Sequence, residues 1–251
     1  MEMSTSYRYL APATRIYSGV DVLENVDREA QRLGAERALV ICSETLSKTS
    51  DLLERVKNVL GDRFINAYTG AKRESPIPLL DAGVLVARKV QPDLIVAVGG
   101  GSAVVTARAI TIMLGENRSI DEMYTKHVDG EAPIVYRALK PKIPNIVVLT
   151  TPTTAVDRGG AAVWDENPPH RKEIYDPKTR PLGIILDGNA LLTAPLALYL
   201  DTSLTTFSGL IGAAQSRNLS PLAYADVRQG VELSMKWLDF GLISQNSFSC
   251  D

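Results

Sequence analysis

Short apolar runs alternate with amphipathic stretches from residue 37 to residue 187, and this alternation constrains the fold more than any other feature. The clearest run, 93–98, is short and almost wholly apolar, which is typical of a strand buried on both faces of a parallel sheet. Similar runs occupy 37–42, 64–68, 145–150 and 182–186, and helical spacing predicts helices over 45–60, 76–90 and 102–114. We therefore predict an α/β fold with a mainly parallel sheet and right-handed crossovers.

The pattern changes after residue 188. Stretches 191–214 and 222–240 have helical spacing, with no strand between them. The sequence therefore predicts an α/β domain over 1–188 and a partial α-helical domain over 189–251. Within the first domain, residues 115–144 are polar and proline-containing, and we expect them to form a surface excursion.

Charge and cysteine content limit the partners and the compartment. The 27 basic and 29 acidic residues give a net charge of −2 without long runs of one sign, so no nucleic acid or anionic membrane is expected as a partner. No apolar stretch has the length of a membrane span, and the N-terminus lacks the pattern of a secretory signal. Cys42 and Cys250 are the only cysteines. We therefore expect a cytoplasmic protein without a disulfide framework.

A glycine run lies where the clearest strand passes into a helix. It consists of Gly99, Gly100, Gly101 and Ser102. Glycines let a ligand approach the backbone closely, and the start of a helix offers free N–H groups that suit phosphate. Ser102 is a candidate N-cap and phosphate donor. The sequence favours a phosphate-binding loop here, the alternative being a tight corner between strand and helix.

A threonine-rich motif follows the run 145–150. It reads Leu-Thr-Thr-Pro-Thr-Thr-Ala over 149–155. Ligands of open parallel sheets bind at the carboxyl ends of strands, so these hydroxyl groups are candidates for cofactor contacts. Taken alone, the motif is explained better as a turn with local hydroxyl–backbone hydrogen bonds.

Taken together, these motifs resemble the iron-containing (group III) alcohol dehydrogenase family. The resemblance rests on 93–102, 151–155 and 187–193, with support from 16–19 and 74–76, and it extends to about residue 215. Maleylacetate reductases belong to that family, and the dehydroquinate synthase and glycerol dehydrogenase fold is its neighbour. The resemblance implies a Rossmann-like dinucleotide-binding domain, a helical domain and an active site in the cleft between them.

The resemblance also implies roles for individual residues at the cofactor. The glycine run would hold the pyrophosphate, and Thr153 and Thr154 would line the cofactor. Ser43 would face the adenosine ribose, where family members often have an aspartate that repels the 2′-phosphate of NADP. Because serine carries no charge, either NAD or NADP is expected as the cofactor. Lys172 matches a family lysine near the nicotinamide, with an ordinary exposed lysine as the alternative.

The family metal is held by one aspartate and three histidines, and this set is incomplete here. Asp201 matches the aspartate, but the position one helical turn later is Thr205, a poor ligand for iron or zinc. His127 and His170 lie outside the motif. A divalent metal therefore has only Asp201 as its expected ligand.

Other positions depart from the family pattern at the nicotinamide end. Val105 and Arg108 stand where the family usually has aspartate and lysine. After the threonines the family usually has a glycine-rich run that contains serine and glutamate, whereas this chain has Val-Asp-Arg-Gly-Gly over 156–160. This difference makes Asp157, Arg158 and Lys172 candidates for different chemistry.

We predict an NAD(P)-dependent oxidoreductase acting on a small alcohol, aldehyde or keto compound, with Lys172 and Asp157 as candidate catalytic residues. The alternatives are a diverged metal-free NAD(P)-binding enzyme of lyase or isomerase type and a non-catalytic binding protein. A homo-oligomer is expected, because apolar residues of the short helical part lack partners within the chain. These residues are Leu204, Phe207, Leu210, Ile211 and Trp237.

Overall fold

The computed structural model describes residues 6–7, 13–217 and 219–246. Ala13–Pro195 forms one compact unit, and the helices from Leu196 onward belong to a second. The domain boundary that the sequence predicts after residue 188 remains a prediction.

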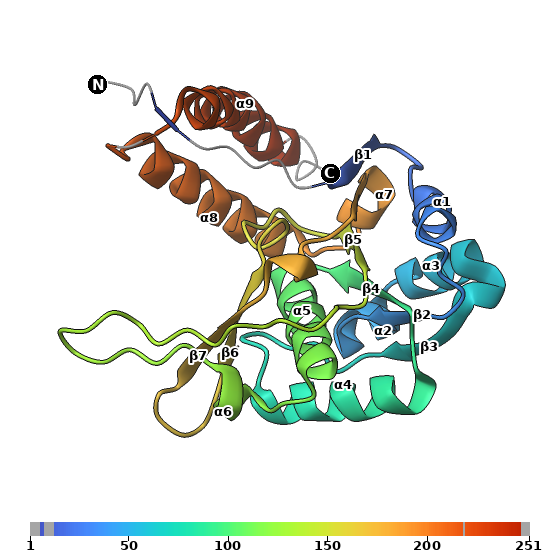
Figure 1. The fold of residues 1–251 in the computed structure, drawn as a ribbon. Coiled ribbons are helices and arrows are strands. Elements are labelled where there is room, and N and C mark those ends of the chain that lie inside the picture. Colours follow the sequence, from blue (N-terminus) through green and yellow to red (C-terminus); the bar gives the residue numbers. More distant parts are fainter. Residues whose placement is uncertain (1–5, 8–12, 218, 247–251) are drawn as a thin grey trace. The chain divides into compact units, whose positions relative to one another are not determined.

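The first unit is built on a six-stranded sheet in the order β1-β8-β5-β4-β2-β3 (Figure 1). Every pairing in it is parallel. Its strands are β1 (Arg15–Gly19), β2 (Ala38–Ile41), β3 (Phe64–Tyr68), β4 (Leu94–Gly99), β5 (Asn145–Leu149) and β8 (Gly183–Asp187). The prediction of a mainly parallel α/β fold is confirmed.

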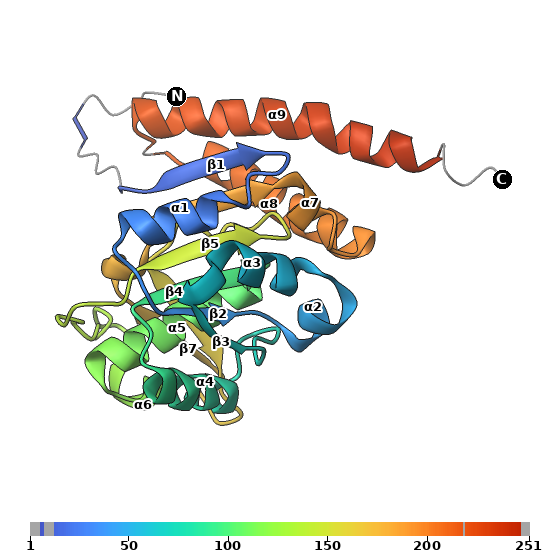
Figure 2. The same ribbon diagram turned by 90° about the vertical axis from the view of Figure 1, so that its right-hand side faces the viewer.

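Helices cover both faces of this sheet (Figure 2). One face carries α1 (Asn25–Arg32) and α3 (Leu52–Leu60), and the other carries α4 (Ile77–Val90) and α5 (Gly101–Glu116). Along β4, Val96 packs into the core under α3 while Ile95 and Ala97 pack into the core under α5. Because both faces are buried, the strand is apolar at every position rather than at alternate ones.

Two local features differ from the sequence prediction. The helix expected over 45–60 is two helices, α2 (Glu44–Thr49) and α3, because Ser50 takes an extended conformation between them. An antiparallel hairpin of β6 (Gly160–Trp164) and β7 (Arg171–Tyr175) was not predicted. Buried and exposed positions alternate along β7, but the sequence does not show this alternation, because one of the buried residues is the charged Lys172.

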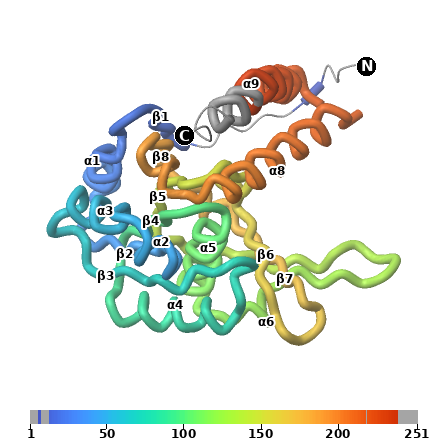
Figure 3. Tube along the Cα trace, turned by 180° about the vertical axis from the view of Figure 1, so that it is seen from behind, coloured from blue at the N-terminus to red at the C-terminus, as the bar shows by residue number. Residues whose placement is uncertain are grey.

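The segment predicted as a surface excursion leaves the sheet as a long loop between α6 (Ile120–Met123) and β5 (Figure 3). Lys142 fixes its end, because its ammonium group is buried between the carboxylates of Glu116, at 2.5 Å, and Asp176, at 2.9 Å. Two short 3₁₀ turns, Gly61–Arg63 and Pro177–Thr179, and helix α7 (Gly188–Leu191) complete this unit.

The second unit consists of α8 (Leu196–Ala214) and α9 (Pro221–Asn246), which pack against each other. Both predicted helices are present. Several of their large apolar side chains are exposed, with Leu204 at 57% and Ile211 at 37%. Among the described residues, no helix is both long and apolar enough to cross a membrane.

Candidate functional site

The carboxyl ends of three neighbouring strands lie at one edge of the sheet. Gly99 at the end of β4 pairs with Leu149 of β5, and Ala97 pairs with Ile41 of β2. The glycine run begins at the last residue of β4, the threonines begin directly after β5, and Ser43 lies two residues after β2. The structure therefore places the predicted cofactor loops at the edge where ligands of open α/β sheets bind.

The glycine run turns the chain from β4 into α5. Gly99 has φ +142°, a conformation that side chains strongly disfavour, and Gly100 is the residue that precedes the helix. Ser102 is therefore not the N-cap that the sequence predicted, since α5 already begins at Gly101 and has no side-chain cap. Among the described residues, nothing accepts a hydrogen bond from the N–H groups of Gly101 and Ser102. Two donors at the positive end of a long helix are thus free for an anion.

The glycine run and the threonine motif pack against each other. A Cβ atom at Gly100 would lie 2.5 Å from Oγ1 of Thr151, and one at Gly101 would lie 2.9 Å from Oγ1 of Thr153. The Thr150 N–H also donates to the Gly99 carbonyl at 3.1 Å. Only glycine fits at this approach, so the two motifs form one structural unit.

Four threonines follow β5, and the last three of them differ in their surroundings. The Thr151 side chain is buried, Thr153 is half-buried and accepts a hydrogen bond from the Ala155 N–H at 3.1 Å, and Thr154 is exposed. Thr151 was quoted in the motif but was not among the predicted cofactor contacts. Its position shortly after a buried strand was the sequence signal that could have placed Thr151 among the predicted cofactor contacts.

A third loop, which the sequence analysis did not assign to the site, reaches the start of α5. Glu74 and Ser75 have φ values of +66° and +50°, although neither is glycine. Ser75 is buried, and its hydroxyl lies 3.0 Å from that of Thr106 on α5 and 3.5 Å from the Ser102 carbonyl. Backbone strain of this kind persists where surrounding contacts hold it and often accompanies functional sites. The Glu-Ser-Pro motif before α4 was the available signal.

Ser43 lies two residues after the end of β2 and caps α2. Its hydroxyl oxygen accepts a hydrogen bond from the Leu46 N–H at 3.1 Å, and the side chain remains half-buried. A serine at this position therefore fixes the start of the helix that follows β2.

Arg108 on α5 organises the chain after the threonine motif. Its guanidinium is buried and donates to the carbonyl oxygens of Gly160, Ala155 and Val156, at 2.8, 2.8 and 3.3 Å. Burial lowers the pKa of Arg108 to about 10. In the sequence Arg108 stood out only as a departure from the family pattern, and the structure shows which loop it holds.

Lys172 lies on β7 and is buried, so the alternative of an ordinary exposed lysine is wrong. Its ammonium group forms ion pairs with Asp121 and Asp165, and it lies 5.3 Å from the ring centroid of Tyr124. Hydrogen bonds to Asp121 and then Asp165 raise the pKa of Lys172, which keeps it protonated at neutral pH. Asp157 is exposed and raises the pKa of Arg108.

Asp201 was the one ligand expected for a metal, and it lies in the second unit, whereas both histidines lie in the first. Asp201 is exposed on α8, and the Thr205 hydroxyl donates to the Asp201 carbonyl at 2.7 Å. His170 stacks on Trp164 in the first unit, with ring centroids 5.1 Å apart, and His127 is exposed in the surface excursion. Within the part of the chain that the structure describes, no three histidine, cysteine, aspartate or glutamate residues could hold a metal ion. These residues alone do not fit the family metal.

Comparison with known proteins gives one family match and many relatives. The model of the family described as iron-containing alcohol dehydrogenase matches residues 13–188. Maleylacetate reductase 1 of Rhodococcus opacus is 32% identical over 119 residues, which cover 47% of this chain and 32% of that protein. The NAD-dependent methanol dehydrogenase of Bacillus methanolicus is 24% identical over 232 residues, covering 92% of this chain and 58% of that protein.

Solved structures show the same fold. The sulfoacetaldehyde reductase of Bifidobacterium kashiwanohense, in complex with NAD+, has a TM-score of 0.84 at 18% identity and covers 96% of this chain and 61% of its own. The iron-containing alcohol dehydrogenase of Thermococcus thioreducens has a TM-score of 0.77 at 22% identity, with 90% and 59% covered. The chain spans between 32% and 61% of the length of these four proteins.

Proposed function

Because the chain belongs to the iron-containing alcohol dehydrogenase family, we propose that it binds NAD or NADP and supports hydride transfer with a small alcohol, aldehyde or keto compound. The observation that carries this proposal is the unit formed by the glycine run and the threonine motif at the carboxyl edge of the sheet. The names of the relatives support it, since they include an NAD-dependent methanol dehydrogenase and several maleylacetate reductases.

In this proposal the phosphate end of the cofactor binds at the start of α5. The free N–H groups of Gly101 and Ser102 donate to pyrophosphate oxygens, and the helix dipole favours the negative charge. Thr153 and Thr154 line the cofactor next to these donors. Ser43 lies beside the ribose and places no negative charge there, so a 2′-phosphate is tolerated.

The nicotinamide end is assigned to Lys172 and Asp157 as candidate catalytic residues. A lysine whose pKa is raised by two aspartates is a poor base, because it stays protonated. Since Asp121 and Asp165 balance its charge, we assign Lys172 the role of a hydrogen-bond donor near the carbonyl or alcohol oxygen. Asp157 is an exposed carboxylate three residues before β6, and we assign it to proton exchange with solvent.

One observation favours a second candidate function, a metal-independent NAD(P)-binding enzyme of lyase or isomerase type. The family name implies iron, which would supply a Lewis acid to the substrate oxygen. Asp201 and Thr205 do not form a ligand set, and the described residues offer no cluster in their place. No step of the proposed mechanism is therefore assigned to a metal.

A binding and turnover experiment tests the proposal. NADH and NADPH are titrated by their fluorescence, and turnover is followed at 340 nm with small aldehydes and keto acids, with and without added Fe²⁺ or Zn²⁺. Saturable cofactor binding with metal-stimulated turnover supports the dehydrogenase. Binding with metal-independent chemistry supports the second candidate, and absence of cofactor binding overturns both.

The homo-oligomer stays a proposal as well. It is supported by the exposed apolar side chains of α8 and α9, among them Leu204 and Tyr224 at 57% and 42% exposure. Light scattering of the folded chain tests it, and a strictly monomeric mass overturns it.

A further inference from the structure

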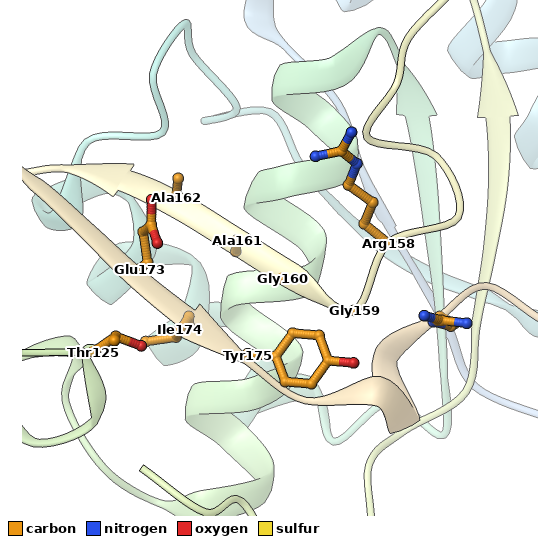
Figure 4. Close-up of a pocket in the computed structure, with 10 residues that line it drawn as sticks. Thr125, Arg158, Gly159, Gly160, Ala161, Ala162, Glu173, Ile174 and Tyr175 are labelled. Atoms are coloured by element: carbon orange, nitrogen blue, oxygen red, sulfur yellow. The ribbon is translucent and has the colours of Figure 1, made fainter. Parts of the chain in front are cut away.

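A cavity of about 400 Å³ lies against the β6–β7 hairpin (Figure 4). Its volume is in the range of pockets that take small ligands. Arg158 and Tyr175 lie toward one end of the hairpin, and Glu173 and Thr125 lie toward the other. The strand register agrees, because Tyr175 is opposite Gly160 whereas Glu173 is opposite Ala162. None of the lining residues belongs to the glycine run or to the threonines of the dinucleotide site.

Two arginines that line this cavity have no acceptor of their own. Among the described residues, neither Arg158 nor Arg180 makes an ion pair or a side-chain hydrogen bond, and the Nε atom of Arg180 is buried. The Nε atom of Arg108 also lacks an acceptor, but three carbonyl oxygens accept from its terminal nitrogens. A buried guanidinium nitrogen without an acceptor is costly unless a ligand supplies one.

The arginines also lie close enough to repel one another. The pKa of Arg108 is lowered to about 10, mainly by burial. Asp157 acts in the opposite direction, and the charges of Arg158 and Arg180 contribute to the lowering. Around Arg108, the charge of one exposed carboxylate, Asp157, is therefore set against those of two neighbouring guanidinium groups. The excess positive charge at one end of the cavity favours an anion there.

We propose that this cavity binds a small organic anion. Its carboxylate or phosphate group lies between Arg158 and Arg180, because the planar guanidinium forks match the oxygens of both groups. Its other end lies near Glu173 and Thr125, where a carboxylate and a hydroxyl select a hydroxyl or amino group as a hydrogen-bond donor. The site is independent of dinucleotide binding.

Inorganic phosphate and succinate are the probes that test this site on the full chain. Isothermal titration calorimetry and thermal unfolding are measured at constant ionic strength, with NaCl as the reference salt. We expect saturable binding of at least one probe and a rise in Tm beyond that given by NaCl. Binding of phosphate alone identifies a phosphate site, and binding of succinate alone identifies a carboxylate site. No saturable binding of either probe overturns the proposal.

Charge-removing variants locate the binding. We expect Arg158→Gln and Arg180→Gln each to weaken the probe about tenfold or more, while the exposed Arg137→Gln leaves it unchanged. Glu173→Gln should tighten binding at least about twofold, because a like charge is removed. If the Arg180→Gln variant does not fold, the probe affinity of the Arg158→Gln variant still tests the proposal, because Arg158 is exposed. Equal affinities in wild type and Arg158→Gln overturn the proposal, as does displacement of the probe by NADH.

Discussion

A Cβ atom added at Gly100 would lie 2.5 Å from the hydroxyl oxygen of Thr151. The two residues come from loops that follow neighbouring parallel strands, β4 and β5. Their approach holds the start of α5 against the threonine motif, and it leaves the N–H groups of Gly101 and Ser102 free toward a ligand. The geometry of the candidate dinucleotide site therefore depends on the absence of one side chain.

Gly100→Ala tests this relationship. We expect a loss of about 1–3 kcal/mol in the free energy of unfolding, because the methyl group forces the loops apart, and NADH binding at least about tenfold weaker because the donors move. Thr151→Ala in the same chain removes the clashing oxygen, so the double variant should recover about 1 kcal/mol or more. Urea unfolding and NADH fluorescence give both values.

Gly212→Ala is the matched control for this substitution. A Cβ atom at Gly212 meets nothing within 4 Å in helix α8. Alanine there should stabilise the chain by up to about 1 kcal/mol through helix propensity. Strictly additive effects of Gly100→Ala and Thr151→Ala would show that the close approach does not govern the site.

Ser43→Asp should change the choice of cofactor. Aspartate caps helices as well as serine does, so α2 should keep its start. The added carboxylate repels a 2′-phosphate, and we expect the Kd of NADPH to rise about tenfold or more while that of NADH stays within about threefold. Fluorescence titration measures both constants. Ser43→Asn caps the helix without a charge, and an equal loss of NADPH binding in that variant would refute the electrostatic explanation.

Arg108→Met should destabilise the chain by about 2–4 kcal/mol, because three carbonyl oxygens lose a buried donor. Arg88→Met is the control, since Arg88 is exposed and, among the described residues, its side chain donates only to the Asn117 side chain, at 2.7 Å. We expect it to cost less than about 0.5 kcal/mol. Chemical denaturation gives the free energy of unfolding of both variants. Similar losses of stability in the two variants would mean that Arg108 does not anchor the 155–160 loop.

Glu29 should make stability depend on acid pH. Burial raises its pKa, but hydrogen bonds from Arg32 at 2.5 Å and Tyr17 at 2.7 Å, with the charges of Arg32 and Arg15, lower it overall. Its stabilising contribution is therefore complete above the pKa of the unfolded chain. That contribution is lost as the pH falls through the lower pKa of the folded chain.

Glu29→Gln should cost about 1–3 kcal/mol at pH 7, and the difference from wild type should shrink toward acid pH. Urea unfolding between pH 7 and pH 3 measures this difference. Glu36→Gln, at an exposed glutamate, is the control and should change little at any pH. If the difference in unfolding free energy between wild type and Glu29→Gln stays constant with pH, the pKa of Glu29 is not lowered in the folded chain.

Local patterns predicted most of the fold. A strand buried on both faces is apolar throughout, and a helix shows its apolar face every third or fourth residue, so β4 and α4 were readable from the chain. The hairpin was not, because the buried position of Lys172 broke the expected alternation and its compensation comes from Asp121 and Asp165. The division of 45–60 into two helices depends on the extended backbone of Ser50.

The sequence by itself determined the parallel sheet, the glycine run at the start of a helix and the family, because these depend on periodicity and on residues that are adjacent in the chain. Only the tertiary structure decided that Gly100 fits against Thr151, that Arg108 holds Ala155 across 47 residues of sequence, and that Arg158 and Arg180 line one cavity. Each of these relationships joins segments that are separated along the chain, and their separation in sequence does not predict how close they lie in the folded structure. The partner of a buried or charged group is fixed by packing and solvation in the folded chain.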